Sequence, residues 1–66
     1  MNNLQPHEER VLDELEELGG KLNKLSVFIK GDGLTSLPDN EQDLLRSQYA
    51  AMTAYYKILV QRIGAF

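Results

Sequence analysis

The chain has 66 residues, of which 42% are hydrophobic and 26% are charged, and its net charge is −3. This length holds one small domain and excludes a multi-domain enzyme, while the composition is that of a chain that folds. The absence of cysteine and the single histidine, His7, exclude disulfides and the usual four-ligand zinc sites. The negative charge disfavours non-specific binding to DNA, RNA or anionic membranes.

Neither a membrane span nor a secretion signal is expected. Apolar runs such as Ile58-Leu59-Val60 are far shorter than the ~20 residues that cross a bilayer. Residues 1–4 carry no basic segment followed by an apolar stretch. The sequence therefore predicts a cytoplasmic protein.

A first helix is predicted over residues 6–30. Its apolar residues recur at alternating steps of four and three, the period of one helical face: Val11, Leu15, Leu18, Leu22, Leu25 and Ile29. Pro6 suits the first turn, where its missing N–H would have no intrahelical partner. Acidic residues fill the first half of the helix, and Lys21, Lys24 and Lys30 lie in the second half, as the helix macrodipole favours.

The pair Gly19-Gly20 lies inside this predicted helix and needs an explanation. Each glycine costs about 1 kcal/mol relative to alanine in a helix interior. Close approach of another helix or of a ligand is one explanation, and a tolerated kink is the other.

A loop over residues 31–37 is predicted to join the first helix to a second. Glycines at 31 and 33 are expected to end the first helix in the left-handed conformation, and they lack the Lys-Ser/Thr of a phosphate-binding loop. The Ser36 hydroxyl is expected to cap the second helix, with Pro38 in its first turn. Residues 1–66 thus form a single domain in this prediction.

The second helix is predicted over residues 38–63. Its apolar stripe again alternates steps of four and three: Leu45, Tyr49, Met52, Tyr56, Leu59, Ile63 and Phe66. The two helices predict an all-α fold, an antiparallel two-helix hairpin. A further set of apolar residues lies off both stripes: Leu12, Phe28, Leu44, Tyr55 and Ile58. Because a core this small rarely stabilises a folded chain on its own, the hairpin is expected to assemble into a compact helical homo-oligomer.

Catalysis is not expected from this sequence. With one histidine near the start and three scattered serines, no nucleophile and base pair is recognisable. The more informative group is Lys21, Lys24, Ser26 and Lys30, whose cations suit phosphate. Lysines near a helix C-terminus are also expected from the macrodipole alone, and the same alternative holds for Arg62 in the second helix.

A set of short motifs, in this order, covers nearly the whole chain: Arg10 to Glu14, Lys21 to Ile29, Ser36-Leu37-Pro38, Glu41-Gln42, Leu45-Arg46, Gln48-Tyr49, Met52, Tyr55-Tyr56 and Ile58 to Ile63. Each motif is weak alone, but the combination is fairly specific. Together they resemble the anti-CBASS cyclic-oligonucleotide sponge family of bacteriophages.

The resemblance implies a homo-hexamer that sequesters cyclic dinucleotides, such as cyclic GMP-AMP, and cyclic trinucleotides, such as cyclic tri-AMP, without cleaving them. Removing these messengers would starve the CBASS effector, and no cofactor or metal is involved. Carried over by motif, Lys24 and His7 would serve the dinucleotide site, and Ser26 and Arg62 the trinucleotide site. Two departures are notable: His7 stands where an aromatic residue is common, and Gly19-Gly20 replaces better helix formers.

Three alternatives remain open at the level of the sequence. A structural or adaptor helical oligomer would have no nucleotide ligand. A coiled-coil adaptor would bind a partner helix through its leucine and tyrosine stripe. A small-molecule enzyme would turn the nucleotide over instead of holding it.

Overall fold

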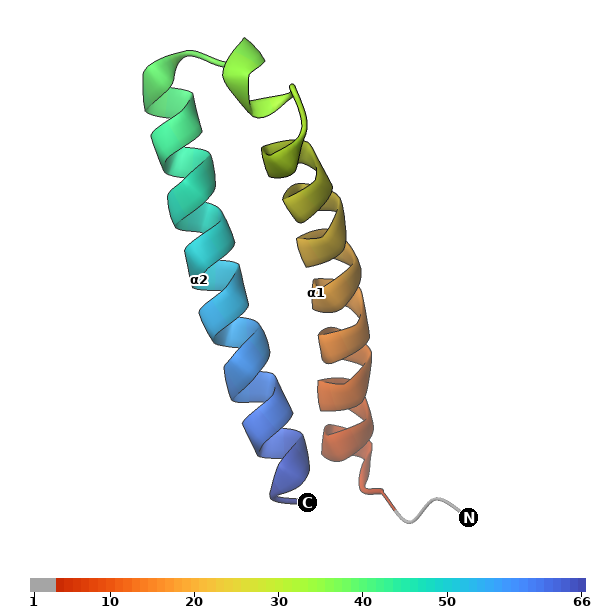
Figure 1. Cartoon of the computed structure of the whole chain (residues 1–66). Helices are drawn as coiled ribbons and strands as arrows, with labels where there is room; N and C mark the ends of the chain where they lie inside the picture. The colour runs from red at the N-terminus through yellow and green to blue at the C-terminus, as the bar shows by residue number, and fades with distance from the viewer. Residues whose placement is uncertain (1–3) are drawn as a thin grey trace.

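The computed structural model describes residues 4–66, which form two long helices joined by a short connection (Figure 1). Helix α1 spans Pro6–Lys30, the 3-10 turn η1 spans Leu34–Ser36, and α2 spans Asp39–Gly64. The predicted all-α pair of packed helices is confirmed, and α2 begins and ends one residue later than predicted. Within the described range, neither helix is long and apolar enough to cross a membrane.

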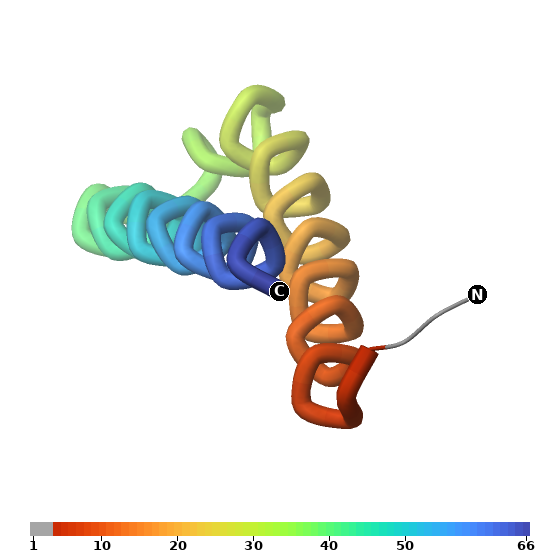
Figure 2. The backbone as a smooth tube through the Cα atoms, turned by 90° about the horizontal axis from the view of Figure 1, so that it is seen from below, coloured from red at the N-terminus to blue at the C-terminus, as the bar shows by residue number. Residues whose placement is uncertain are grey.

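The hairpin is elongated, with extents of 48 × 17 × 14 Å and a radius of gyration of 15.1 Å. A compact chain of this length would have a radius of gyration of about 11 Å. The start of α1 and the end of α2 lie at the same end of the molecule (Figure 1). The axes of α1 and α2 are inclined to each other (Figure 2). One hairpin therefore exposes most of the circumference of both helices.

Helix α1 begins with a reciprocal arrangement at its first turn. Pro6 takes the first helical position, as predicted, and Glu8 and Glu9 place negative charge beside the free N–H groups. The Gln5 N–H donates to the Glu8 carboxylate at 2.7 Å. The Gln5 side chain accepts from the Glu8 backbone N–H in return, which completes a capping box at the start of α1.

The C-terminal end of α1 differs from the prediction. Gly31 has φ −91° and ψ −163°, an extended conformation, and no residue in the described part of the chain has a positive φ. The expected left-handed glycine cap is therefore wrong. A Cβ at Gly33 would lie 2.5 Å from the Phe28 ring, so a larger residue at this position would require that exposed ring to move.

The start of α2 also corrects an expectation. The Ser36 hydroxyl donates to the Gly33 carbonyl at 2.6 Å and so stabilises η1 without capping α2. Pro38 is the residue preceding the first helical position, and the Gln42 side-chain amide donates to the Leu37 carbonyl at 2.8 Å. The Gln42 side chain folds back over the N-terminal end of α2, and its hydrogen bond links the connection to this helix.

The core lies along the line where the two predicted stripes meet. Val11 and Leu18 of α1 and Leu59 of α2 are buried, and Leu59 has no exposed surface. Five half-buried residues pack around them: Leu15, Leu22, Met52, Tyr56 and Ile63. Phe66 was predicted to extend the stripe, but it follows the end of α2 and is 44% exposed. The stripes predicted the centre of the core and overextended it at this end.

A large apolar surface remains outside the core. Seven large hydrophobic side chains are exposed: Val27, Phe28, Leu44, Tyr55, Ile58, Val60 and Phe66. The accessible surface of 5087 Å² exceeds the about 4,200 Å² expected for a compact monomer of 7.5 kDa. Four of the five apolar residues predicted to lie off the stripes are among these exposed side chains: Phe28, Leu44, Tyr55 and Ile58. An exposed apolar surface of this kind is typical of a surface that contacts a partner.

Candidate functional site

Two shallow grooves share the lysines of the second half of α1. The interhelix groove has a volume of about 380 Å³ and is lined by Lys21, Lys24, Leu25, Gln48 and Met52. The outer groove has a volume of about 600 Å³ and is lined by Asp13, Glu16, Glu17, Gly20, Lys21 and Lys24. The α1 lysines therefore lie at the border between two surfaces of different chemistry.

The interhelix groove combines two cations with an apolar surface. Leu25 and Met52 provide its apolar wall, one from each helix, while Lys21 and Lys24 supply charge and no carboxylate lines it. The Gln48 amide lies 3.8 Å from the Met52 sulfur, a weak contact that leaves most of its hydrogen-bonding capacity free. The groove offers ammonium donors for phosphate, an apolar surface for a ring and an amide for a polar edge.

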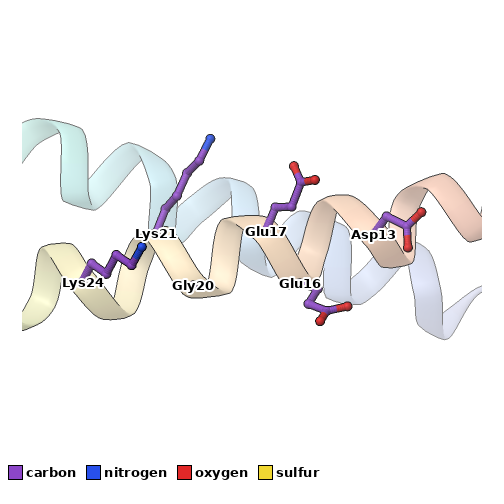
Figure 3. A pocket seen from close by; sticks show the side chains of 6 residues that line it. All are labelled: Asp13, Glu16, Glu17, Gly20, Lys21 and Lys24. Atoms are coloured by element: carbon purple, nitrogen blue, oxygen red, sulfur yellow. The ribbon is translucent and has the colours of Figure 1, made fainter.

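The outer groove is built from α1 alone and carries both signs of charge. Its three carboxylates precede Gly20 along the helix and its two lysines follow it (Figure 3). All of these side chains are exposed. A phosphate in this groove would meet three like charges, so this surface is less suited to a nucleotide than the interhelix groove.

The two glycines of α1 have different surroundings. A Cβ on Gly19 would lie 3.3 Å from the Tyr56 ring, so this glycine allows close approach of α2. A Cβ on Gly20 would meet nothing within 4 Å. Helix approach therefore accounts for Gly19, whereas the packing within one chain does not account for Gly20.

A polar link crosses the two helices near the core. The Tyr55 hydroxyl of α2 donates to the Glu14 carboxylate of α1. This hydrogen bond, with a smaller effect of burial and the nearby negative charge, raises the pKa of Tyr55 above its ordinary value, and Arg62 partly opposes the shift. The link joins α1 to α2 close to Lys21.

The four predicted site residues do not meet within one chain. Lys24 lines both grooves, while His7 is exposed in the first turn of α1, about 25 Å away at 1.5 Å per residue. Ser26 is half-buried near the end of α1, and Arg62 is exposed in the last turn of α2. Because the helices are antiparallel, Ser26 and Arg62 lie toward opposite ends of the hairpin. No cluster of metal-ligating side chains occurs in residues 4–66.

A family model described as Sequestin matches residues 5–65. The chain belongs to the Sequestin family. This match confirms the family assignment predicted from the ordered motifs. The chain is also 35% identical, over 60 residues, to an uncharacterized 7.5 kDa protein in the denB-rIIB intergenic region of Enterobacteria phage T4. That alignment covers 91% of this chain and 94% of the phage protein. No solved structure matches the chain.

The structure adds residues to the candidate site that the sequence did not indicate. Gln48 and Met52 of α2 join Lys24 in the interhelix groove, and Glu14 joins Tyr55. These partners come from different helices, so their proximity depends on the register of the hairpin. The sequence had already indicated Lys21, because it belongs to the group of Lys21, Lys24, Ser26 and Lys30 that suits phosphate.

The Tyr55 to Glu14 link predicts a measurable titration. Replacing Glu14 with glutamine should lower the pKa of the Tyr55 phenol toward its ordinary value, because the hydrogen bond to a carboxylate is lost. An ultraviolet titration of phenolate in Glu14→Gln, with Tyr55→Phe to assign the signal, measures this. The raised pKa favours the protonated phenol in the folded chain. The stabilisation that this hydrogen bond provides is therefore present below the ordinary pKa of tyrosine. It is lost as the pH rises through the raised pKa of Tyr55 in the folded chain. An unchanged titration in Glu14→Gln would contradict the link.

Proposed function

We propose that this member of the Sequestin family is a non-catalytic phage anti-defence protein that binds cyclic di- and trinucleotides in the host cytoplasm and withholds them from the CBASS effector. The family name denotes sequestration, and the phage T4 relative supports a phage origin. The structural observation that carries the proposal is the interhelix groove, which combines two lysines with an apolar wall and lacks carboxylates.

The interhelix groove suits the parts of a cyclic dinucleotide. Lys24 and Lys21 neutralise the phosphates, and the Leu25 and Met52 side chains contact the face of a base. The Gln48 amide reads a polar edge of that base, since it offers both donors and an acceptor. None of these five residues is a nucleophile with an adjacent base, so the ligand is held and not cleaved.

Assembly completes the sites in this proposal. The groove of one chain is open, and His7 is too far from Lys24 to contact the same ligand from the same chain. A second copy supplies the missing wall and brings its own His7 to stack on a base. The exposed apolar side chains and the excess of surface support a homo-oligomer, for which the sequence resemblance implies a hexamer.

The trinucleotide site is assigned to Ser26 and Arg62 from different chains of the assembly. Arg62→Ala should weaken binding of cyclic tri-AMP by roughly tenfold or more, because an arginine hydrogen bond to phosphate is lost, while binding of cyclic GMP-AMP is retained. Competition titration with both ligands measures this. Arg46→Ala is the matched control, since Arg46 is an exposed arginine of α2 paired at 3.5 Å with Asp43. Equal effects of the two variants, or equal loss of both ligands, would contradict separate sites.

Calorimetric titration of the full chain tests the proposed function directly. The wild type should bind cyclic GMP-AMP and cyclic tri-AMP without competition between them, and should bind a linear dinucleotide of the same bases much more weakly. Light scattering on the same sample should give the mass of an oligomer. An intact oligomer without affinity for either cyclic ligand would contradict the proposal and favour a structural adaptor.

A further inference from the structure

Tyr55 differs from the other two tyrosines of α2 in keeping part of its ring outside the core. Tyr49 and Tyr56 are half-buried, and the Tyr56 ring packs against the core and beside Gly19. Tyr55 is 40% exposed and does not belong to the core cluster. Of the three rings, that of Tyr55 is therefore the one most open to a ligand.

The side chain of Tyr55 is held at both ends. Its Cα belongs to α2, and its hydroxyl donates a hydrogen bond to the Glu14 carboxylate of α1. An aromatic side chain that is fixed before binding loses little conformational entropy when a ligand contacts it. The exposed ring of Tyr55 thus has the properties of a stacking surface for a nucleotide base.

Arg62 lies on the same face of α2 as Tyr55. The two residues are seven positions apart, so at 3.6 residues per turn they point in nearly the same direction, about 10 Å apart along the helix axis. The hydrogen bond to Glu14 raises the pKa of Tyr55 and the charge of Arg62 opposes the rise, as expected for a guanidinium near the phenol. Among residues 4–66, no carboxylate forms an ion pair with Arg62. Its charge is therefore free to bind an anion.

A cyclic trinucleotide presents phosphates and bases in alternation around one ring. A cation and an aromatic surface on one helix face therefore suit a phosphate and a base of the same molecule. We propose that a base of the cyclic trinucleotide stacks on the ring of Tyr55 while Arg62 of the same chain binds a neighbouring phosphate. This inference rests on the proposed function, which assigns Arg62 to the trinucleotide site. Tyr55 does not line the interhelix groove, so binding of the dinucleotide should not depend on it.

Two substitutions at position 55 separate stacking from the other roles of the side chain. Tyr55→Leu keeps an apolar side chain without the ring, whereas Tyr55→Phe keeps the ring, and both lose the hydrogen bond to Glu14. Tyr55→Leu should weaken binding of cyclic tri-AMP by roughly fivefold or more, because base stacking is lost. Tyr55→Phe should retain most of the affinity. Both variants should bind cyclic GMP-AMP as the wild type does.

A third substitution reports the contact directly. The chain has no tryptophan, so Tyr55→Trp introduces the only indole in the sample. Because a stacked base quenches indole fluorescence, cyclic tri-AMP should quench the emission of this variant and cyclic GMP-AMP should leave it nearly unchanged. Light scattering on each variant compares the mass of its assembly with that of the wild type.

The outcomes distinguish this inference from the proposed function. Equal affinities of Tyr55→Leu and Tyr55→Phe for cyclic tri-AMP, or no quenching in Tyr55→Trp, would overturn the stacking role and leave the proposed function standing. A reduced mass of Tyr55→Leu, or equal loss of both ligands, would also overturn it. A wild type without affinity for cyclic tri-AMP would contradict both. Selective loss of cyclic tri-AMP in Tyr55→Leu at the wild-type mass, with quenching in Tyr55→Trp, would support the stacking role.

Discussion

Replacing Lys24 with alanine is expected to weaken binding of cyclic GMP-AMP by roughly 10- to 100-fold. The reason is that a hydrogen bond between an ammonium and a phosphate contributes about 1.5 to 3 kcal/mol. Lys24 lines the interhelix groove beside Leu25 and Met52, so its loss removes a cation at the place where the proposed phosphate lies. Calorimetric titration of the variant and the wild type at equal salt concentration measures the change.

Two variants separate this effect from a general loss of positive charge. Lys30→Ala removes an exposed lysine from the last turn of the same helix, and Lys30 lines neither the interhelix groove nor the outer groove. It should leave the affinity nearly unchanged. Lys24→Arg keeps the charge and should retain part of the affinity. Equal losses for Lys24→Ala and Lys30→Ala, or no loss for Lys24→Ala, would contradict the assignment of Lys24 to the site.

Replacing Leu59 with alanine is expected to lower the free energy of unfolding by about 2 to 5 kcal/mol. Leu59 has no exposed surface and packs in the cluster with Val11 and Leu18, so the substitution leaves a cavity where the two helices meet. Chemical denaturation at one fixed chain concentration measures the loss, because assembly makes the apparent stability depend on concentration.

The control for Leu59→Ala is a polar residue two positions further along the helix. Gln61 is exposed, and Gln61→Ala should change the free energy of unfolding by less than about 0.5 kcal/mol. A large loss in Gln61→Ala with little loss in Leu59→Ala would mean that the packed face of α2 is assigned wrongly.

The helices were predictable because their signal is local and repeated. Steps of three and four along α1 and α2 identify one face of each helix, and that face supplies the buried residues Val11, Leu18 and Leu59. The helix ends were less predictable. Ser36 is a favourable capping residue, but its hydroxyl is used by η1, and the presence of that turn is not visible in the residue pattern. The single-domain assignment to residues 1–66 stays a prediction.

The candidate site was predictable only in part, because two of the four residues beside Lys24 in the interhelix groove come from the other helix. Lys24 was indicated by the family resemblance and lies in a groove, but Gln48 and Met52 join it only through the antiparallel register. The link between Glu14 and Tyr55 depends on the same register. His7 lies apart from Lys24 in one chain, so its role depends on the arrangement of copies and stays a prediction.

Recovery of the ligand after binding tests the central claim most directly. The full chain is mixed with a limiting amount of cyclic GMP-AMP, the free ligand is measured after ultrafiltration, and the retained fraction is denatured by heat and analysed by chromatography. The account predicts little free ligand before denaturation and release of intact cyclic GMP-AMP afterwards, in the amount added. Ligand that stays free throughout, or that is recovered as a linear or hydrolysed product, would contradict sequestration without cleavage.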